Sequence, residues 1–207
     1  MCYSFHSSLI GWLVGTGASI YMLSQPDIYN NWISLFILTY SQIQIFEAIL
    51  WSSLEKKDIN SYTTSIIPYL LLVQPLINSY MGYQITNEKI LYYMSLFYIF
   101  LILYYAFITR NSTYETIISK NGTLDWNRYE GEQKVQFLGN AFVGVVYLLG
   151  LFIPLFFIPN VTMRYIAITY AFVTFFYMLY IYRSELSSRW CYAVIWLSIL
   201  ALIFNKK

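Results

Sequence analysis

The stretch SQIQIFEAILW, residues 41–51, places one glutamate and two glutamines inside an otherwise apolar segment that runs from Trp32 to Leu54. The segment has 23 residues, and a helix needs about 20 to cross the hydrocarbon core of a bilayer. Glu47 is the only carboxylate within any apolar segment of this kind in the chain. Such a carboxylate costs roughly 2–3 kcal/mol unless it is paired or protonated. The stretch therefore predicts a membrane helix that carries a polar site.

The composition places the whole chain in a membrane. Of its 207 residues, 58% are hydrophobic and 11% are charged, whereas a soluble domain carries about 25% charged residues. Because too few charges remain to build a polar surface, the lipid bilayer is the expected partner. The net charge of +2 gives no indication of nucleic-acid binding. We expect an all-α, polytopic helical bundle that forms one integral membrane domain, residues 1–207.

Six further apolar stretches meet or approach the length of a transmembrane helix. The seven expected spans are 8–23, 32–54, 62–83, 90–109, 137–158, 161–182 and 190–204. Most of the connections are about 6–9 residues long, as expected for antiparallel neighbours.

One connection, residues 110–136, is longer and carries both acidic and basic side chains. In it, ETIIS (115–119), KNG (120–122) and TLDWNR (123–128) have the pattern of two short strands around an Asn-Gly turn. This pattern predicts a β-hairpin-like loop between the fourth and fifth helices. The alternative is a solvated loop that folds over the helix ends.

The distribution of Lys and Arg predicts the orientation, because cytosolic loops carry an excess of these residues. The side that holds the N-terminus has eight of them and the other side has four, so we expect a cytosolic N-terminus. Asn111 and Asn121 begin N-glycosylation sequons in the long loop. Their glycosylation on a lumenal face would contradict this orientation.

The polar residues of the second span share one face. At 100° per residue, the side chains that fall within about 60° of one another are Tyr40, Gln44, Glu47 and Trp51. Gln42 points nearly the opposite way. The second span therefore carries a single polar stripe.

The third span carries a matching polar face. Gln74 and Asn78 are one turn apart, and Pro75 lies between them. Pro75 and Pro68 each remove a backbone donor, so we expect a kinked or locally opened helix. Transporters place substrate and ion sites beside such interrupted helices.

Two other interpretations of this polar set remain open besides a functional site. In the first, the side chains hydrogen-bond to one another and only hold two helices together. In the second, Glu47 lies near the cytosolic rim, because only about 10 Å of helix separates it from Leu54. Lys56 or Lys57 would then reach back towards the carboxylate.

Small residues mark two packing faces. Gly11 and Gly15 form a GxxxG pattern in the first span, and such residues let helix backbones approach closely. The residues of the fifth span that suggest the same role are Gly139, Gly144 and Gly150. We expect both faces to pack against helices of this chain or of a second copy.

The sequence contains no motif typical of an enzyme. A zinc hydrolase needs several His and Asp ligands, and the only histidine is His6. Retinal binding needs a lysine within the membrane, and none lies in an expected span. The serines have no His or Lys base at a plausible depth, and a Gly-rich phosphate loop is missing. We therefore expect no catalysis and no metal or other cofactor.

Several segments carry a resemblance to known proteins. They are MCYSFHSSLIGWLVGTG (1–17), QIFEAILW (44–51), LLVQPLIN (71–78), NGTLDW (121–126) and WCYAVIW (190–196). Through them the chain resembles a family of small seven-span membrane proteins of large DNA viruses of protists and algae and of some of their hosts. The resemblance implies a viral origin and a host-cell or virion membrane, and it implies no activity. The residues it highlights are Glu47, Gln74, Pro75, Trp190 and Cys191.

Cys2 and Cys191 lie near the same expected membrane face. Juxtamembrane cysteines are the usual targets of S-acylation, so both are candidate acylation sites. A small buried thiol that packs among aromatic rings is the alternative.

These observations lead to three hypotheses about function. The first is a transporter- or channel-like protein in which a polar pocket binds and releases a proton or cation. The pocket residues are Glu47, Gln44, Gln74 and Asn78. The second is a structural or interaction protein of a viral or host membrane, whose partners are further copies or other membrane proteins. The third is a receptor-like sensor for a small apolar ligand lodged among the aromatic rings.

Overall fold

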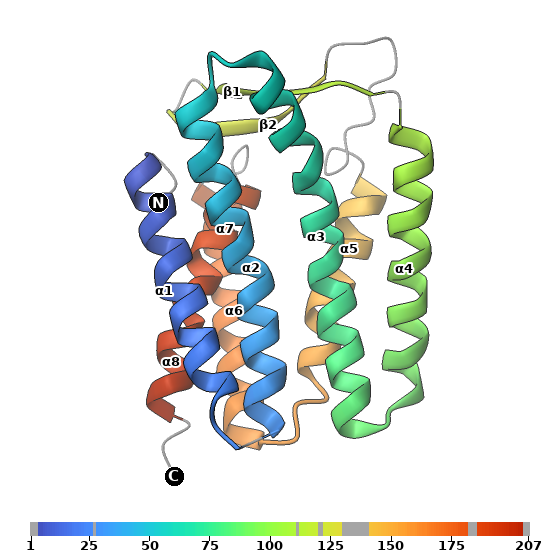
Figure 1. The fold of residues 1–207 in the computed structure, drawn as a ribbon. Coiled ribbons are helices and arrows are strands. Elements are labelled where there is room, and N and C mark those ends of the chain that lie inside the picture. Colours follow the sequence, from blue (N-terminus) through green and yellow to red (C-terminus); the bar gives the residue numbers. More distant parts are fainter. Residues whose placement is uncertain are drawn as a thin grey trace.

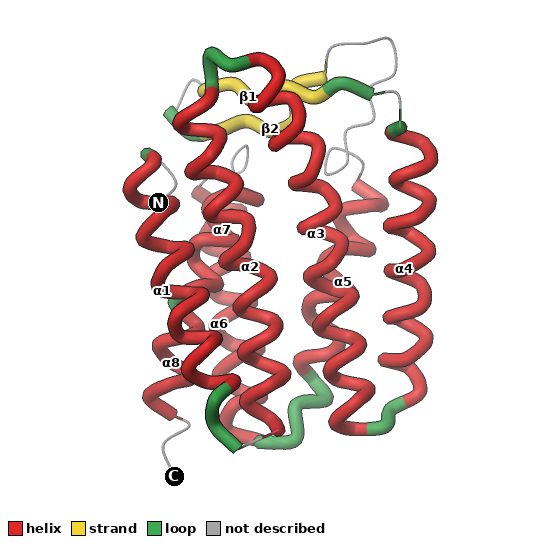
Figure 2. Tube along the Cα trace, viewed as in Figure 1, coloured by secondary structure: helices red, strands yellow, loops and turns green. Residues whose placement is uncertain are grey.

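The computed structural model describes residues 4–26, 28–110, 112–119, 122–129, 141–181 and 186–204. The helices of this part are α1 (Phe5–Leu23), α2 (Ile28–Ser53), α3 (Lys57–Thr86), α4 (Lys89–Thr109), α5 (Ala141–Leu155), α6 (Val161–Ile181), α7 (Leu186–Ile195) and α8 (Leu197–Phe204). The strands β1 (Tyr114–Ile118) and β2 (Leu124–Tyr129) form a two-stranded sheet. The helices lie side by side along one direction, and the sheet lies across one end of them (Figures 1 and 2).

The helical bundle with its small sheet confirms the expected fold class, but the number of membrane-spanning helices differs from the expected seven. By length and composition, three of the described helices can cross a bilayer. These segments are Asn31–Ser53, Lys89–Thr109 and Val161–Ile181. The difference has two causes. First, some helices are too short, because the last expected span is divided at Trp196 into two short helices and α5 has only 15 described residues. Second, α1 and α3 are long enough, but their mean hydropathy is lower than that of the three spanning segments.

Local sequence features set the ends of two helices. α1 begins at a capping box in which Ser4 and Ser7 exchange side chain–backbone hydrogen bonds, both 3.2 Å long. α3 ends at Asn87, whose φ of 57° is left-handed, a conformation that asparagine tolerates at a helix C-terminus. Between its ends α3 continues through Pro68 and Pro75. The two prolines therefore lie within one continuous helix and do not end it.

The β-hairpin predicted in the long connection is confirmed. β1 and β2 pair antiparallel, and Gly122 has a φ of 76° in the connecting turn, where a residue without a Cβ is favoured. The pairing register changes by one between Glu115 and Ile117, so two residues of β2, at positions 126 and 127, stand opposite Thr116 at a β-bulge. Leu124 and Trp126 of β2 are buried in the same hydrophobic cluster as residues of α2, α3, α5 and α7. The hairpin is therefore packed on the helical bundle as well as joined to it.

The outer surface of the bundle is apolar. In the most apolar window of α4 only 22% of the residues are buried, and in that of α6 only 17%, compared with 61% in α2. Phe100, Leu103 and Phe107 of α4 are each more than half exposed. A soluble monomer rarely exposes apolar patches of this extent. The exposed faces of α4 and α6 have the character of lipid-facing surface.

Candidate functional site

The polar stripe of α2 lies in the centre of the bundle. Gln44, Glu47 and Tyr40 are all 0% exposed, so the carboxylate faces neighbouring helices and not lipid. Lys56 and Lys57 are exposed at the start of α3. This burial shows that Glu47 packs within the protein, and its depth relative to the cytosolic rim stays a prediction.

Gln74 of α3 is the second member of the site. It is 0% exposed, and its Oε1 accepts a short hydrogen bond from the hydroxyl of Tyr147 on α5. The hydroxyl of Tyr40 lies within interaction range of the Tyr147 hydroxyl. Two phenols and one amide from three helices are thus gathered at one place.

Cys191 of α7 completes the group. Its thiol is 1% exposed and lies near the side chains of Gln74 and Glu47. Nε2 of Gln74 is buried near this thiol and forms no hydrogen bond of regular geometry. The buried position agrees with the packing alternative for Cys191. It removes the exposure that S-acylation of this cysteine requires.

We call this group the polar seam; its members are Tyr40, Gln44, Glu47, Gln74, Tyr147 and Cys191. It joins four helices, α2, α3, α5 and α7, and every member is less than 10% exposed. Carboxyl, phenol, thiol and carboxamide groups all carry exchangeable protons or accept hydrogen bonds. Chemically, such an arrangement can hold a proton or a small cation and pass a proton between neighbouring groups.

Asn78 has a separate role. Its Oδ1 accepts a hydrogen bond of 2.8 Å from Nε1 of Trp32 on α2, and its Nδ2 donates one of 2.9 Å to the carbonyl of Leu151 on α5. Both ends of the Asn78 carboxamide thereby have hydrogen-bond partners within the protein. Asn78 therefore connects α2, α3 and α5, as the helix-packing interpretation predicts, and is not a member of the polar seam.

The two proline-bearing helices meet beside the polar seam. A Cβ at Gly150 of α5 would collide with the Tyr98 hydroxyl of α4 and would lie 2.6 Å from Cβ of Pro75. The Tyr98 hydroxyl also donates a hydrogen bond of 2.6 Å to the carbonyl of Val146. Gly150 thus permits the close approach of α3, α4 and α5. Gly144, which the sequence suggests for the same role, has no atom of the described residues within 4 Å of its would-be Cβ, so the described helices show no such contact at this position.

The small residues of α1 confirm their predicted packing role. Gly11 and Gly15 are both buried. A Cβ at Gly15 would lie 2.7 Å from Cβ of Ser41 on α2 and 3.2 Å from Ile195 of α7. The partner surfaces belong to this chain, and a second copy is not needed to explain the pattern.

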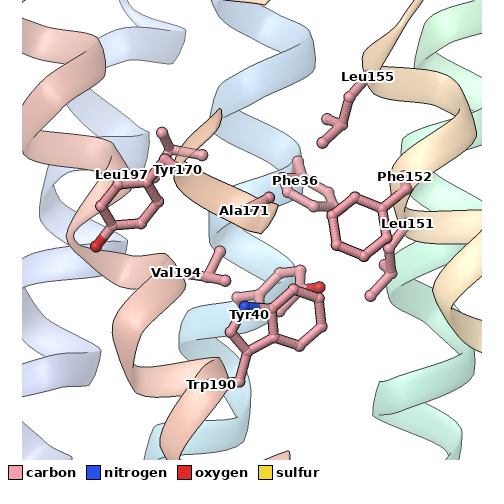
Figure 3. A pocket seen from close by; sticks show the side chains of 10 residues that line it. All are labelled: Phe36, Tyr40, Leu151, Phe152, Leu155, Tyr170, Ala171, Trp190, Val194 and Leu197. Carbon is pink, nitrogen blue, oxygen red and sulfur yellow. The ribbon is translucent and has the colours of Figure 1, made fainter. Parts of the chain in front are cut away.

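A small cavity lies next to the polar seam, between α2, α5, α6, α7 and α8. Figure 3 shows the aromatic and aliphatic side chains that surround it. Trp190 is central, stacked on Phe152 at 5.9 Å and edge-on to Tyr40 at 6.2 Å. The cavity has room for about one water molecule, which is far below the roughly 300–1,000 Å³ typical of a ligand pocket. The packing here gives little support to a sensor of small apolar ligands.

Several predicted site residues lie outside the described part of the chain. They are Cys2, Asn111, Asn121 and Gly139. Within the described part, no three His, Cys, Asp or Glu residues lie close enough to hold a metal ion.

The sequence did not single out Tyr147 as a member of the seam. Tyr147 lies in α5 among apolar neighbours and carries no local signal of polarity. Comparisons of the chain with protein-family models, with curated proteins and with solved structures give no match.

Proposed function

We propose that this protein is a transporter- or channel-like membrane protein in which Glu47 binds and releases a proton or a small cation. One observation carries the proposal, namely that Glu47 is fully buried in a seam of polar groups from four helices. Ionisable residues inside membrane domains are rare and usually mark a pathway or a proton relay. If the polar residues only held helices together, amide side chains would be sufficient, as the hydrogen bonds of Asn78 illustrate, and a carboxylate would not be needed.

The position of the prolines supports movement of the seam during such a cycle. Pro75 of α3 removes the donor for the carbonyl of Leu71, and Pro154 of α5 removes the donor for the carbonyl of Gly150. Helices bend most easily where a ladder hydrogen bond is missing. Since both helices contribute to the seam through Gln74 and Tyr147, bending would change the surroundings of Glu47.

The proposal includes more membrane spans than the three that length and composition identify. Polar side chains lower the mean hydropathy of a helix wherever they lie, but buried ones need not face lipid. In α3 the buried polar residues are Asn60, Thr63, Thr64, Gln74, Asn78 and Ser79. The alignment of all the helices in one bundle supports α1, α3, α5 and the consecutive α7 and α8 as further spans (Figure 1). This arrangement retains the seven-span topology.

Replacement of Glu47 by glutamine tests the proposed function. We expect Glu47→Gln to abolish proton- or cation-coupled flux in proteoliposomes, because the amide keeps the size of the side chain but cannot ionise. Flux of protons, monovalent cations and a panel of small solutes is measured with fluorescent indicators and radiolabelled solutes. Gln42→Ala is the matched control, since Gln42 lies on the same helix and its Nε2 bonds only to the carbonyl of Leu38 and the hydroxyl of Ser41. Equal flux in the Glu47→Gln variant and the parent would refute a coupling role.

A structural or interaction protein is the second candidate, and Asn78 favours it. The three-helix contact of this residue shows that polar groups in this bundle do serve packing. On this hypothesis the protein gives no flux under any condition. Glu47→Gln then changes thermal stability or the recovery of partner proteins in detergent extracts.

The location follows from the resemblance and the charge distribution. We propose a host-cell or virion membrane, with the N-terminus and the hairpin on the cytosolic side. Expression in a secretory cell line tests the orientation. The sequons at Asn111 and Asn121 should remain unmodified, and a shift in mass that is reversed by glycosidase would show the opposite orientation.

A further inference from the structure

The β1–β2 hairpin covers the end of the bundle at which the polar stripe of α2 finishes. Trp51 follows Glu47 by one helical turn, and its side chain packs against the hydrophobic cluster that contains Leu124 and Trp126 of β2. Leu124 is 4% exposed and Trp126 is 9% exposed. Figure 1 shows both strands crossing this end of the bundle at the level of the last turn of α2 and the first turns of α3. Leu124 and Trp126 thus share one buried cluster with the seam residues Tyr147 and Cys191.

Polar contacts hold the hairpin on α3. Nδ2 of Asn60 donates a hydrogen bond of 2.9 Å to the carbonyl of Thr116, and its Oδ1 accepts one of 2.8 Å from the Thr116 backbone N–H. The hydroxyls of Thr64 and Thr116 are 2.7 Å apart. Thr116 stands opposite the bulge of β2, and its backbone N–H and carbonyl both bond to the side chain of Asn60. Water can replace each of these hydrogen bonds when the hairpin separates from α3.

Two buried donors under the hairpin favour such a separation. Nε1 of Trp126 and Nε1 of Trp51 are both buried, and neither has a hydrogen-bond partner. A buried donor without a partner costs free energy that contact with water would recover. The apolar burial of Leu124 and Trp126 opposes opening of the hairpin. Hydration of the two indole N–H groups lowers the free energy that opening requires.

We propose that the hairpin is a lid that controls the access of water and protons to Glu47 from this end of the bundle. In the closed arrangement Asn60 and Thr64 hold β1, and Trp126 seals the end of the polar stripe. In the open arrangement the two indole N–H groups become hydrated and the polar seam is connected to the aqueous phase. The inference rests on the proposed function, because it assigns a regulator to the same Glu47 site.

The buried thiol of Cys191 provides a native reporter of lid opening that does not depend on flux. The experiment measures the rate at which a small water-soluble maleimide alkylates Cys191 in the full chain in nanodiscs, read by mass spectrometry of the peptide. We expect Asn60→Ala to raise this rate about tenfold or more, since two hydrogen bonds to Thr116 are lost. Ser65→Ala is the matched control, because Ser65 lies on the same helix and its hydroxyl bonds only to the carbonyl of Tyr62. An unchanged rate in a folded Asn60→Ala protein overturns the proposal.

A locked lid keeps the test decisive where Asn60→Ala fails to fold. Thr64→Cys combined with Thr116→Cys places two thiols where the hydroxyls are 2.7 Å apart, so oxidation should join β1 to α3. We expect the oxidised protein to be alkylated at Cys191 at least about tenfold more slowly than its reduced form. Equal rates in the two forms would show that the hairpin does not control access. Because alkylation is read without transport, this result is independent of whether Glu47→Gln changes flux.

Discussion

At the scale of single residues, two amides one turn apart on α3 have different tasks. Asn78 has both ends of its carboxamide bonded, to Trp32 and to Leu151. Gln74 has its Oε1 bonded to Tyr147, while its Nε2 faces the seam beside Cys191. An amide with both ends bonded to neighbouring helices fixes the position of those helices. We therefore expect Asn78 to contribute to stability, and we propose Gln74 as a member of the functional site.

Substitution of Asn78 should therefore destabilise the protein. Asn78→Ala leaves the buried indole N–H of Trp32 without its acceptor and removes the hydrogen bond to the Leu151 carbonyl of α5. We therefore expect a decrease of about 1–3 kcal/mol in the free energy of unfolding. Denaturant titration in detergent micelles, followed by circular dichroism, measures it. Ser52→Ala serves as the control, because this exposed hydroxyl bonds only to the carbonyl of Ile49. A change of less than about 0.5 kcal/mol in Asn78→Ala, which is typical of neutral surface substitutions, would contradict the assignment.

At the scale of elements, α5 is positioned by one of its two described glycines. Gly150 lies against Tyr98 and Pro75, whereas Gly144 has open space around its Cα. The sequence treats the two glycines alike, since both lie in the same apolar helix. Only the neighbours of each residue separate the packing glycine from the other.

The two glycines give a matched pair of substitutions. We expect Gly150→Ala to lower stability by about 1–3 kcal/mol, because the new methyl group forces α3, α4 and α5 apart. Gly144→Ala should leave stability unchanged or raise it by up to about 1 kcal/mol, as alanine is the better helix former. Thermal unfolding of both variants under identical conditions tests the pair. Destabilisation of equal size in the two variants would show that the close contact at Gly150 does not contribute to stability more than the open position of Gly144.

At the scale of the whole molecule, the distribution of exposed apolar side chains defines the surface that meets lipid. Few residues of α4 and α6 are buried, whereas α2 is mainly buried. The buried face of α4 includes Leu91 and Tyr98. Each of these two outer helices thus packs one face against the protein and exposes an apolar face at the outer surface of the bundle.

A photoactivatable lipid should distinguish these two faces. In liposomes we expect label on Leu103 and Phe107 of α4 and on Val173 of α6, which are each more than half exposed. Leu91 and Ala167, buried at 0% and 1% exposure on the same two helices, should carry none. Mass spectrometry of labelled peptides gives the positions. Label on the buried faces in intact protein would contradict the arrangement of α4 and α6.

The sequence alone determined the membrane bundle, the hairpin and the polar faces of α2 and α3, because each depends on local periodicity or turn chemistry. Tertiary structure decided which other helices complete the site. Tyr147 reaches Gln74 across 73 residues, and Asn60 reaches Thr116 across 56. Helical geometry fixes which residues of one helix share a face, but no local interaction determines which distant helix turns towards that face. For the same reason, hydropathy could not separate a polar residue buried in protein from one exposed to lipid.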